Sequence, residues 1–380
     1  MKNLRVLHIV PWFPNPENTI EGVFIASHIK ALQQHCENSV LHIKFTDVKK
    51  DMFCGTENGI PITRIEIKPL IDKWRLKELL AANRIKDFLS KKHANYDMVL
   101  FSVAYPNAIN LGKLKQQFKT IKFVLVEHWS AYHTQFNLAK NNSGRNRIES
   151  IFSHSTPLIV VSNALGDDIK LFTGFDNLKF DVIPNIVDHQ LFFFKEPNLE
   201  KPFTFCSINN WSEMKNPFLL IDAFNLIQQK HTNVRLILAG SGNLDEAIKE
   251  KIKLLRLENK IQFLGRVSKE KVASILKEAH IYCQSSNYET FSVICIEALS
   301  CGTPVLATNI GGVKDYLNNE NGHLVDTLES IDWADSMERI MLNFKHYNLK
   351  KISEDSLRRF NSKKIGRQFY DTLLKISDEK

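Results

Sequence analysis

Ser286-Asn-Tyr-Glu-Thr-Phe-Ser-Val-Ile-Cys-Ile-Glu-Ala-Leu-Ser-Cys-Gly-Thr-Pro-Val-Leu-Ala-Thr308 is the stretch that decides the fold, and it holds Glu289 and Glu297 eight positions apart. Glu297 interrupts an apolar run, and a buried carboxylate without hydrogen bonds costs several kcal/mol. We therefore expect strong donors around Glu297. The apolar run ends at Gly302 and Pro304, residues that typically stop a helix.

The start of this helix predicts an anion-binding site. A loop at 287–290 precedes it, so the backbone amides near Phe291, Ser292 and Val293 have no partners within the helix. These amides and the helix dipole make that end positive. Glu297 lies about one and a half turns further along, where it could accept hydrogen bonds from vicinal hydroxyls. A nucleoside diphosphate sugar carries the matching groups in this order: a diphosphate for the helix start and the vicinal hydroxyls of a ribose for Glu297.

The segment resembles the Glu-x7-Glu signature of retaining glycosyltransferases with the GT-B fold, in particular family 4 (glycosyltransferase group 1). Helix, stop, buried strand and the Gly311-Gly312 turn follow in that family's order. The resemblance implies that Glu297 binds ribose hydroxyls and that Glu289 is catalytic, beside the transferred sugar. It also implies donor contacts at Thr290, Phe291, Ser292 and Val293. The spacing alone would fit two ordinary helix glutamates.

Length and composition are those of a two-domain globular protein. The chain has 380 residues, of which 43% are hydrophobic and 24% charged, which is typical of soluble proteins. The N-terminal stretch Leu4–Val10 reads as a short strand stopped by Pro11 rather than as a signal peptide, so we expect a cytoplasmic protein. Six cysteines form no CxxC motif, and we expect reduced core residues without a metal site of that kind.

Short apolar strands alternate with helix-length segments, which predicts an α/β protein with parallel sheets. Together with the resemblance, this indicates a GT-B fold: two Rossmann-like domains facing each other across a cleft. We expect an N-terminal acceptor-side domain at 1–188, a linker at 189–202 and a nucleotide-sugar-binding domain at 203–359. The last helix, about 360–380, is expected to cross back to the first domain. The predicted strands are Arg5–Val10, Val40–Phe45, Ile62–Ile67, Met98–Ser102, Phe123–Glu127, Leu158–Val161, Phe203–Ile208, Val234–Ala239, Ile261–Leu264, Ala279–Gln284 and Val305–Ala307.

Two features of the first domain are candidates for chemistry. The Pro/Asn-rich turn from Pro11 to Gly22 brings backbone close to a ligand, and it resembles the family's glycine-containing loop at the donor phosphates; a plain turn is the alternative. His128 ends a strand in the string Glu-His-Trp-Ser-Ala-Tyr. That string resembles the family loop whose histidine contacts the transferred sugar, so we interpret His128 as catalytic, with Glu127 as a less certain companion.

Several loops of the second domain resemble donor-binding loops. Lys215 matches the family's diphosphate-clamping lysine, but Asn209 or Asn210 stands where the family has an arginine. Arg266 is a candidate to replace that lost guanidinium. The Gly240 turn and the loop holding Val267 resemble segments that approach the donor, the second through main-chain contact with the nucleobase.

These features predict a retaining transferase that moves a hexose-type sugar from a nucleotide sugar to a glycan or lipid-linked acceptor in cell-surface polysaccharide synthesis. A UDP-sugar is preferred and a GDP-sugar is the second choice. No Asp-x-Asp motif is present, so we expect catalysis without a metal cofactor, with Lys215 and helix amides stabilising the diphosphate. A GT-B-like sugar-nucleotide 2-epimerase and a non-catalytic nucleotide-sugar-binding protein are the alternatives. Glycoside hydrolysis is disfavoured because its two carboxyls must face each other across a bond.

Positive charge is concentrated in one short region. The net charge is +8, and residues 64–92 hold nine basic and four acidic side chains. Apolar residues recur there at helical spacing, which predicts an amphipathic helix with a basic face. Such a helix at 72–92 could lie on an anionic membrane, although a core-facing helix with a solvated face fits as well. No nucleic-acid-binding motif accompanies the charge, so we expect no nucleic acid partner.

Overall fold

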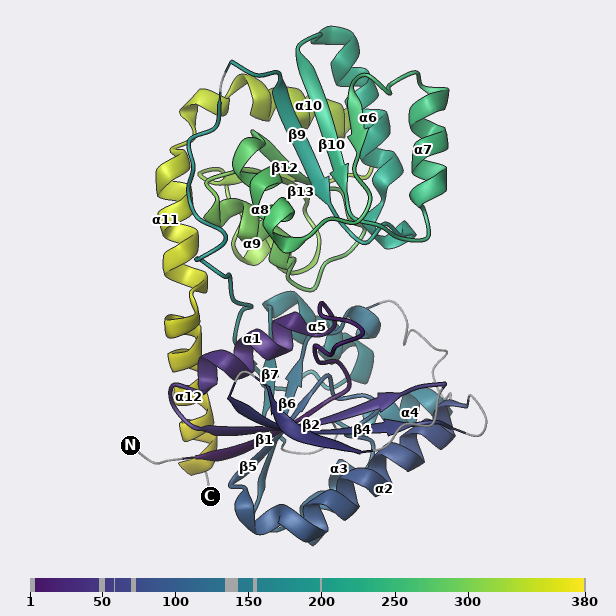
Figure 1. Ribbon diagram of the computed structural model, residues 1–380, viewed down its shortest axis with the longest axis vertical. Coiled ribbons are helices and arrows are strands. Elements are labelled where there is room, and N and C mark those ends of the chain that lie inside the picture. Colours follow the sequence, from purple (N-terminus) through teal and green to yellow (C-terminus); the bar gives the residue numbers. More distant parts are fainter. Residues whose placement is uncertain are drawn as a thin grey trace. The chain divides into compact units, whose positions relative to one another are not determined.

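The computed structural model describes residues 4–47, 52–57, 59–69, 73–133, 143–152, 156–198 and 200–378 (Figure 1). The chain forms two compact units: unit 1 is Met1–Ile186 with Ser362–Lys380, and unit 2 is Val187–Asn361. The boundary between the units therefore lies two residues before the predicted end of the first domain at 188. The C-terminal segment returns to unit 1 from Ser362 onward, whereas Phe360 belongs to unit 2.

Unit 1 is built on a twisted sheet in the order β3-β4-β2-β1-β5-β6-β7-β8. The pairs are parallel except for β3 with β4. Its strands are β1 Arg5–Val10, β2 Glu37–Phe45, β3 Phe53–Glu57, β4 Ile60–Ile67, β5 Met98–Ser102, β6 Lys122–Glu127, β7 Leu158–Val160 and β8 Asp181–Val182. Its helices are α1 Val23–Leu32, α2 Trp74–Lys92, α3 Leu111–Gln117, α4 Ser143–Glu149, α5 Asn163–Thr173 and α12 Ser362–Asp378.

The C-terminal helix α12 is an integral part of unit 1 and runs beside α1 (Figure 1). Phe369, Tyr370 and Leu373 are buried in the same core cluster as residues of β1, β5 and β6. Gly366 permits the close approach of the two helices, because a Cβ there would lie 2.6 Å from the carbonyl oxygen of Ala31. The apolar face of α12 thus completes the core under this part of the sheet.

Unit 2 contains a parallel sheet in the order β11-β10-β9-β12-β13-β14. Its strands are β9 Phe203–Ile208, β10 Val234–Ala239, β11 Ile261–Phe263, β12 Ile281–Gln284, β13 Val305–Thr308 and β14 Gly322–Val325. Its helices are α6 Pro217–Lys230, α7 Asp245–Leu254, α8 Lys269–Glu278, α9 Val293–Ser300, α10 Ser330–Leu342 and α11 Leu349–Phe360. The inner strands β9, β10, β12 and β13 are almost fully buried, as in parallel sheets with helices on both faces, which explains their nearly continuous apolar sequences.

The segment 189–202, expected as a linker, is part of unit 2, and three of its residues pack on that unit. Phe192 is fully buried. The ring of Phe194 packs closely on Gly302, because a Cβ on that glycine would lie only 2.6 Å from the ring. The ammonium of Lys277 lies 3.3 Å from the ring centroid of Phe193. Three consecutive aromatic residues therefore hold this segment in place.

Three absences are found in the part of the chain that the structure describes. None of its helices is long and apolar enough to cross a membrane. No group of three or more His, Cys, Asp or Glu side chains there is arranged to hold a metal ion. All six cysteines are free, and five are buried as expected. The sixth, Cys54, is exposed on the edge strand β3, which corrects the expectation of a core residue at this position.

Candidate functional site

The candidate site of unit 2 lies where the order of its strands reverses. β9 and β12 are neighbours in the sheet, but the chain leaves β9 toward β10 and leaves β12 toward β13. Ligands of open parallel sheets bind at the carboxyl ends of strands at such a reversal. The loop after Ile208 leads to Lys215, and the loop after Gln284 leads to α9.

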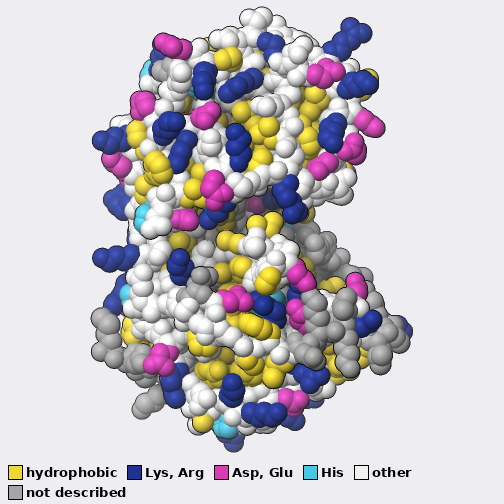
Figure 2. Space-filling view, viewed as in Figure 1, with side chains coloured by type: hydrophobic (Ala, Val, Ile, Leu, Met, Phe, Trp, Pro, Cys, Tyr) yellow, Lys and Arg dark blue, Asp and Glu magenta, His cyan; other side chains and the backbone are white. Residues whose placement is uncertain are grey.

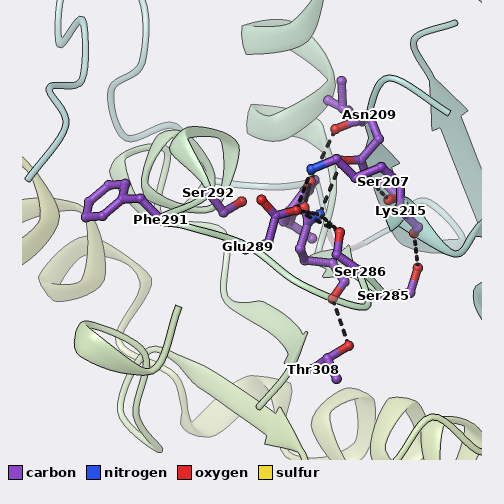
Figure 3. Close-up of polar contacts among 12 residues, drawn as sticks. Ser207, Asn209, Lys215, Ser285, Ser286, Glu289, Phe291, Ser292 and Thr308 are labelled. Atoms are coloured by element: carbon purple, nitrogen blue, oxygen red, sulfur yellow. Dashed lines mark hydrogen bonds and ion pairs between the residues drawn. The ribbon is translucent and has the colours of Figure 1, made fainter. Parts of the chain in front are cut away.

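An ion pair joins these two loops. The ammonium of Lys215 lies 2.6 Å from the carboxylate oxygen Oε1 of Glu289, and the two residues are 74 positions apart in the sequence. Both side chains are partly accessible, with relative exposures of 24% and 11%. Figure 3 shows the Lys215 side chain reaching Glu289 from the β9 side. The fold therefore brings together the two residues that we predicted for the diphosphate and the transferred sugar.

Gln284, the last residue of β12, organises the polar groups around this pair. Its amide nitrogen lies 2.7 Å from Glu289 Oε1, 2.6 Å from Ser286 Oγ and 3.2 Å from Asn209 Oδ1. Ser286 Oγ also donates to Glu289, at 2.7 Å. Glu289 therefore receives two neutral donors in addition to the Lys215 cation, and its carboxylate is held in one orientation (Figure 3).

The backbone of Glu289 is fixed by the turn after β13. The amide of Gly312 donates to the Glu289 carbonyl at 2.9 Å. Gly311 adopts a left-handed conformation, with φ of 64°, and a Cβ there would lie 1.9 Å from the Glu289 carbonyl oxygen. Only glycine fits at this contact, so the Gly311-Gly312 turn serves as a support for Glu289.

The start of α9 carries an unsatisfied polar group, the hydroxyl of Ser292. Ser292 is its N-cap with φ of 62°, a left-handed conformation that is uncommon outside glycine, and its side chain does not cap the helix. Its Oγ is buried without a hydrogen-bond partner. Val293 begins the helix and is half-buried, as is Thr290. The Phe291 side chain instead packs against Tyr316 and Phe360, at ring distances of 5.2 and 5.8 Å. Only the backbone of Phe291 is therefore available to a ligand.

Glu297 differs from the expectation that protein donors satisfy it. Its side chain is half-buried, and it makes no hydrogen bond or ion pair with any residue that the structure describes. Burial raises the pKa of Glu297 to about 8, an effect that Lys269 opposes and Asp188 reinforces. The protein thus holds a carboxyl group whose ionised form needs donors from elsewhere.

The other predicted donor residues of unit 2 lie on the loops after β9, β10 and β11, at the same edge of the sheet. Gly240 packs against Asn209, where a Cβ would lie 1.9 Å from the Asn209 carbonyl oxygen, and its amide donates to Gly265 at 2.7 Å. Arg266 and Val267 come directly after Gly265 in the sequence. Arg266 is exposed and forms no ion pair with a described residue. Asn210 is exposed as well. Of the two asparagines, Asn209 joins the hydrogen-bond network and Asn210 does not.

In unit 1 the Pro11–Gly22 loop is folded back on itself and anchored to the sheet. Gly22 has φ of 64°, and a Cβ there would lie 2.4 Å from the Trp12 carbonyl oxygen. The buried Arg64 donates to the Pro14 carbonyl at 3.1 Å and to His42 Nδ1 at 3.1 Å. Burial, then the Arg64 charge, lower the pKa of His42 to about 3. The neutral imidazole of His42 can therefore accept from Arg64 at neutral pH.

His128 lies at the end of β6 beside a second histidine. Its ring is 5.4 Å from that of His28 and 5.0 Å from that of Phe24. Burial, then the proximity of His28, lower its pKa well below the ordinary value, so the ring is neutral at neutral pH. Its Nδ1 atom is buried without a partner. A neutral histidine with a free ring nitrogen can donate to or accept from a ligand hydroxyl.

Glu127 has a structural part in this loop. Its carboxylate accepts hydrogen bonds from the amides of Ala104, His128 and Trp129 and from the Tyr132 hydroxyl. Burial raises its pKa, and these donors oppose the rise. Glu127 therefore orders the backbone that presents His128, rather than facing a ligand itself.

The residues that sequence reasoning missed are polar side chains that support the predicted ones. Gln284 and Ser286 orient Glu289, while Arg64 and His42 hold the Pro11–Gly22 loop. A polar residue that ends an apolar strand, as Gln284 does, was the available signal, because such positions face the carboxyl edge of a parallel sheet.

Comparison with known proteins identifies this architecture. Residues 188–354 match the family described as glycosyl transferases group 1, and they make up nearly all of unit 2. The sequence of unit 2 is therefore similar to the group 1 glycosyltransferases. The sucrose-phosphate synthase of Thermosynechococcus elongatus superposes with a TM-score of 0.77 at 18% identity, over 98% of this chain and 99% of that one. The chain therefore has the GT-B fold.

Several proteins that are similar to this chain have names that specify a reaction. N-acetyl-alpha-D-glucosaminyl L-malate synthase of Bacillus anthracis is 24% identical over 78% of this chain and 80% of its own length. The phosphatidylinositol N-acetylglucosaminyltransferase subunit from Arabidopsis thaliana is 29% identical over 43% of this chain, and the match spans only 36% of that protein. HepE of Anabaena, in complex with UDP, has a TM-score of 0.76 at 19% identity, over 98% of this chain and all of that one.

Proposed function

We propose that the protein is a retaining glycosyltransferase that moves a hexose-type sugar from a nucleoside diphosphate sugar to a glycan or lipid-linked acceptor. The observation that carries the proposal is the arrangement at the β9–β12 reversal: a cation, an uncapped helix start and two carboxyl groups within one segment. These groups match a diphosphate, a ribose and a transferred sugar in the order of the donor molecule.

Each residue has a stated part in the proposed reaction. The amides at Ser292 and Val293 and the ammonium of Lys215 hold the diphosphate, and the carboxylate of Glu297 accepts from the ribose hydroxyls. Glu289 hydrogen-bonds the transferred sugar, and the proposed part of His128, in unit 1, is a hydrogen bond to a sugar hydroxyl. The role of Arg266 is to supply the second phosphate contact that Asn209 does not make.

The proposed step exchanges two bonds at the anomeric carbon. The bond from that carbon to the diphosphate oxygen breaks, and the acceptor oxygen forms its bond on the same face of the sugar. The acceptor proton passes to the departing phosphate oxygen, so charge and atoms balance. Lys215 and the helix amides stabilise the negative charge that develops on the diphosphate, and we propose that no metal cofactor is required.

UDP-sugars are our preferred donors, with GDP-sugars second. Support for this preference comes from the similar fold of HepE, which was crystallised with UDP and with UDP-glucose. We further propose that the enzyme works in cell-surface polysaccharide synthesis, in the cytoplasm or peripherally on the inner face of the membrane. The basic helix within 72–92 supports the membrane part; Asp72 itself lies outside the described residues.

Product analysis tests the proposed reaction. The protein is incubated with UDP-glucose, UDP-N-acetylglucosamine or GDP-mannose, with and without a panel of glycan and lipid-linked acceptors. We expect acceptor-dependent release of the nucleoside diphosphate and a product whose anomeric configuration matches that of the donor. Inverted product would contradict retention. Acceptor-independent formation of a new sugar or nucleotide sugar would favour an epimerase, and binding without any turnover would favour a non-catalytic protein.

A further inference from the structure

A groove on unit 1, remote in sequence from the residues of the proposed reaction, has an apolar floor and a basic rim. Its volume is about 900 Å³, within the range of about 300–1,000 Å³ that is typical of small-molecule sites. One side comes from the β3–β4 hairpin and the other from α2. Figure 2 shows hydrophobic side chains gathered on unit 1 with Lys and Arg side chains beside them.

The periodicity of β4 and α2 explains the apolar lining. On β4, Thr63, Ile65 and Ile67 alternate along the strand and share one face. On α2, Leu76, Leu80 and Phe88 follow the four-residue spacing of one helical stripe. These three α2 residues are only half-buried, whereas Ala81, Ala82, Ile85 and Leu89 form the buried face of the same helix.

The rim of the groove is positively charged. Lys68, Arg84, Lys91 and Lys92 line it, against Glu66 and Asp87. Arg84, Lys91 and Lys92 are exposed on α2, and Lys68 is exposed at the end of β4. None of the four basic residues forms an ion pair with a described residue, so their charges are available to an external anion.

We infer that this groove binds an anionic phospholipid, with a hydrocarbon chain between β4 and α2 and the phosphate on the basic rim. An apolar floor under a ring of cations is complementary to this amphiphile and not to a free phosphate or a nucleic acid backbone, which would leave the floor exposed to water. The inference rests on the proposed function, because a lipid-linked acceptor places the enzyme at a membrane. Trp74 at the start of α2, with 58% exposure, is positioned to enter the headgroup layer.

Cys54 provides a direct probe of the groove. It lines the groove and is the one exposed thiol among the six cysteines. Its modification by N-ethylmaleimide is followed by mass spectrometry, in the absence of any sugar nucleotide, with Cys54→Ser as the control for background labelling. Mixed vesicles of phosphatidylglycerol and phosphatidylcholine should slow the labelling of Cys54 at least about fivefold at low salt. Glycerol 3-phosphate and polyuridylic acid should not.

A charge-reversal variant separates the groove from general electrostatic attraction. Lys68, Arg84, Lys91 and Lys92 are changed together to Glu, and Lys253, Lys271, Lys345 and Lys350 of unit 2 are changed to Glu as the matched control. The four unit 2 lysines are exposed. In the groove variant, vesicles should no longer protect Cys54, and the affinity for vesicles should fall at least about tenfold. The unit 2 control variant should keep most of the Cys54 protection and most of the vesicle affinity.

Several results would overturn the inference. These are no protection of Cys54 by anionic vesicles, equal protection by pure phosphatidylcholine, protection by polyuridylic acid, or vesicle binding that leaves Cys54 fully reactive. Such a result combined with normal UDP binding and sugar transfer would remove the lipid site and leave the proposed function intact. Protection of Cys54 by anionic vesicles without any nucleotide binding would support the lipid site and contradict the proposed function.

Discussion

In unit 2, the Lys215 ammonium and the Glu289 carboxylate lie 2.6 Å apart across two loops that are 74 positions apart in the sequence. The ligand-free site thus neutralises its own cation. A diphosphate that binds Lys215 must compete with Glu289 or share the ammonium with it. Mutation can therefore distinguish the role of Glu289 from that of Lys215, because removing one charge leaves the other without its ion-pair partner.

Changing Glu289 to Gln should keep UDP binding and abolish most of the transfer. The amide retains the shape of the side chain but no longer pairs with Lys215, so the ammonium is free for the diphosphate. We expect UDP affinity by calorimetry to be equal or higher, more so at low salt, and turnover to fall at least about tenfold. Loss of UDP binding in this variant would contradict the separate roles.

Changing Lys215 to Ala should weaken UDP binding and lower turnover at least about tenfold, since the developing diphosphate charge loses its cation. The matched control is Lys253→Ala, which removes an exposed lysine of the same unit. EDTA should leave the parent enzyme unchanged. Activity that vanishes with EDTA and returns with Mn²⁺ would show that a metal, rather than Lys215, carries this role.

Arg266→Ala tests the replacement for the missing arginine. Arg266 is exposed and forms no ion pair with a described residue, so its removal should change the protein's stability little. We expect the dissociation constant of UDP to rise by about tenfold, as for the loss of one charge-assisted phosphate contact. The affinity for uridine, which lacks the diphosphate, should not change. An unchanged UDP affinity would exclude Arg266 from the diphosphate site.

Glu297→Gln should show a characteristic pH dependence. The folded pKa of Glu297, about 8, lies above the ordinary 4.5, so its contribution to stability is present below about pH 4.5 and is lost as pH rises through about 8. The melting temperature of the variant relative to the parent should therefore increase between these pH values. Glu258→Gln, which changes an exposed glutamate of unit 2, should show no such trend.

The same substitution should reduce UDP affinity by about 1.5 to 3 kcal/mol, because the ribose hydroxyls lose a charged acceptor. UDP affinity of the parent should improve as pH rises through about 8 and the carboxyl ionises, while that of the variant should stay flat. Equal affinities at every pH would show that Glu297 does not contact the ribose.

Gly311→Ala should destabilise unit 2 and impair the site, whereas Gly265→Ala should have a smaller effect. Both glycines have positive φ, 64° and 63°, so alanine at either position costs about 1 kcal/mol of backbone strain. Only at Gly311 does the new Cβ meet backbone, 1.9 Å from the Glu289 carbonyl oxygen; at Gly265 the space is open. Thermal unfolding measures the difference, and equal losses would contradict the supporting role of Gly311.

The strands of both sheets could be predicted from sequence because parallel strands buried on both faces are short apolar runs. Four strands, β1, β5, β9 and β10, have their predicted bounds. The edge strands β3, β8 and β14 were missed. Gly55 and Gly322 weaken the strand pattern of β3 and β14, and β8 has only two residues. The packing of Phe192, Phe193 and Phe194 on unit 2 was missed as well, because that segment has no periodicity.

For the site, the sequence predicted the charged and glycine residues but not their partners. The Lys215–Glu289 contact and the Gln284–Asn209 contact each join residues more than seventy positions apart, and only the order of strands brings them together. The sequence also could not show that Glu297 lacks donors among the described residues or that the Phe291 side chain faces the core. These depend on packing in three dimensions.

The most direct test of the central claim is amide hydrogen exchange of the parent protein with and without saturating UDP. The account predicts slower exchange at the start of α9, in peptides that cover Glu289–Glu297, and in the loop from Asn209 to Lys215. The same peptides of Glu297→Gln should be protected less at equal UDP concentration. Slower exchange confined to other parts of the chain, or none at any UDP concentration, would contradict a nucleoside diphosphate site at the β9–β12 reversal.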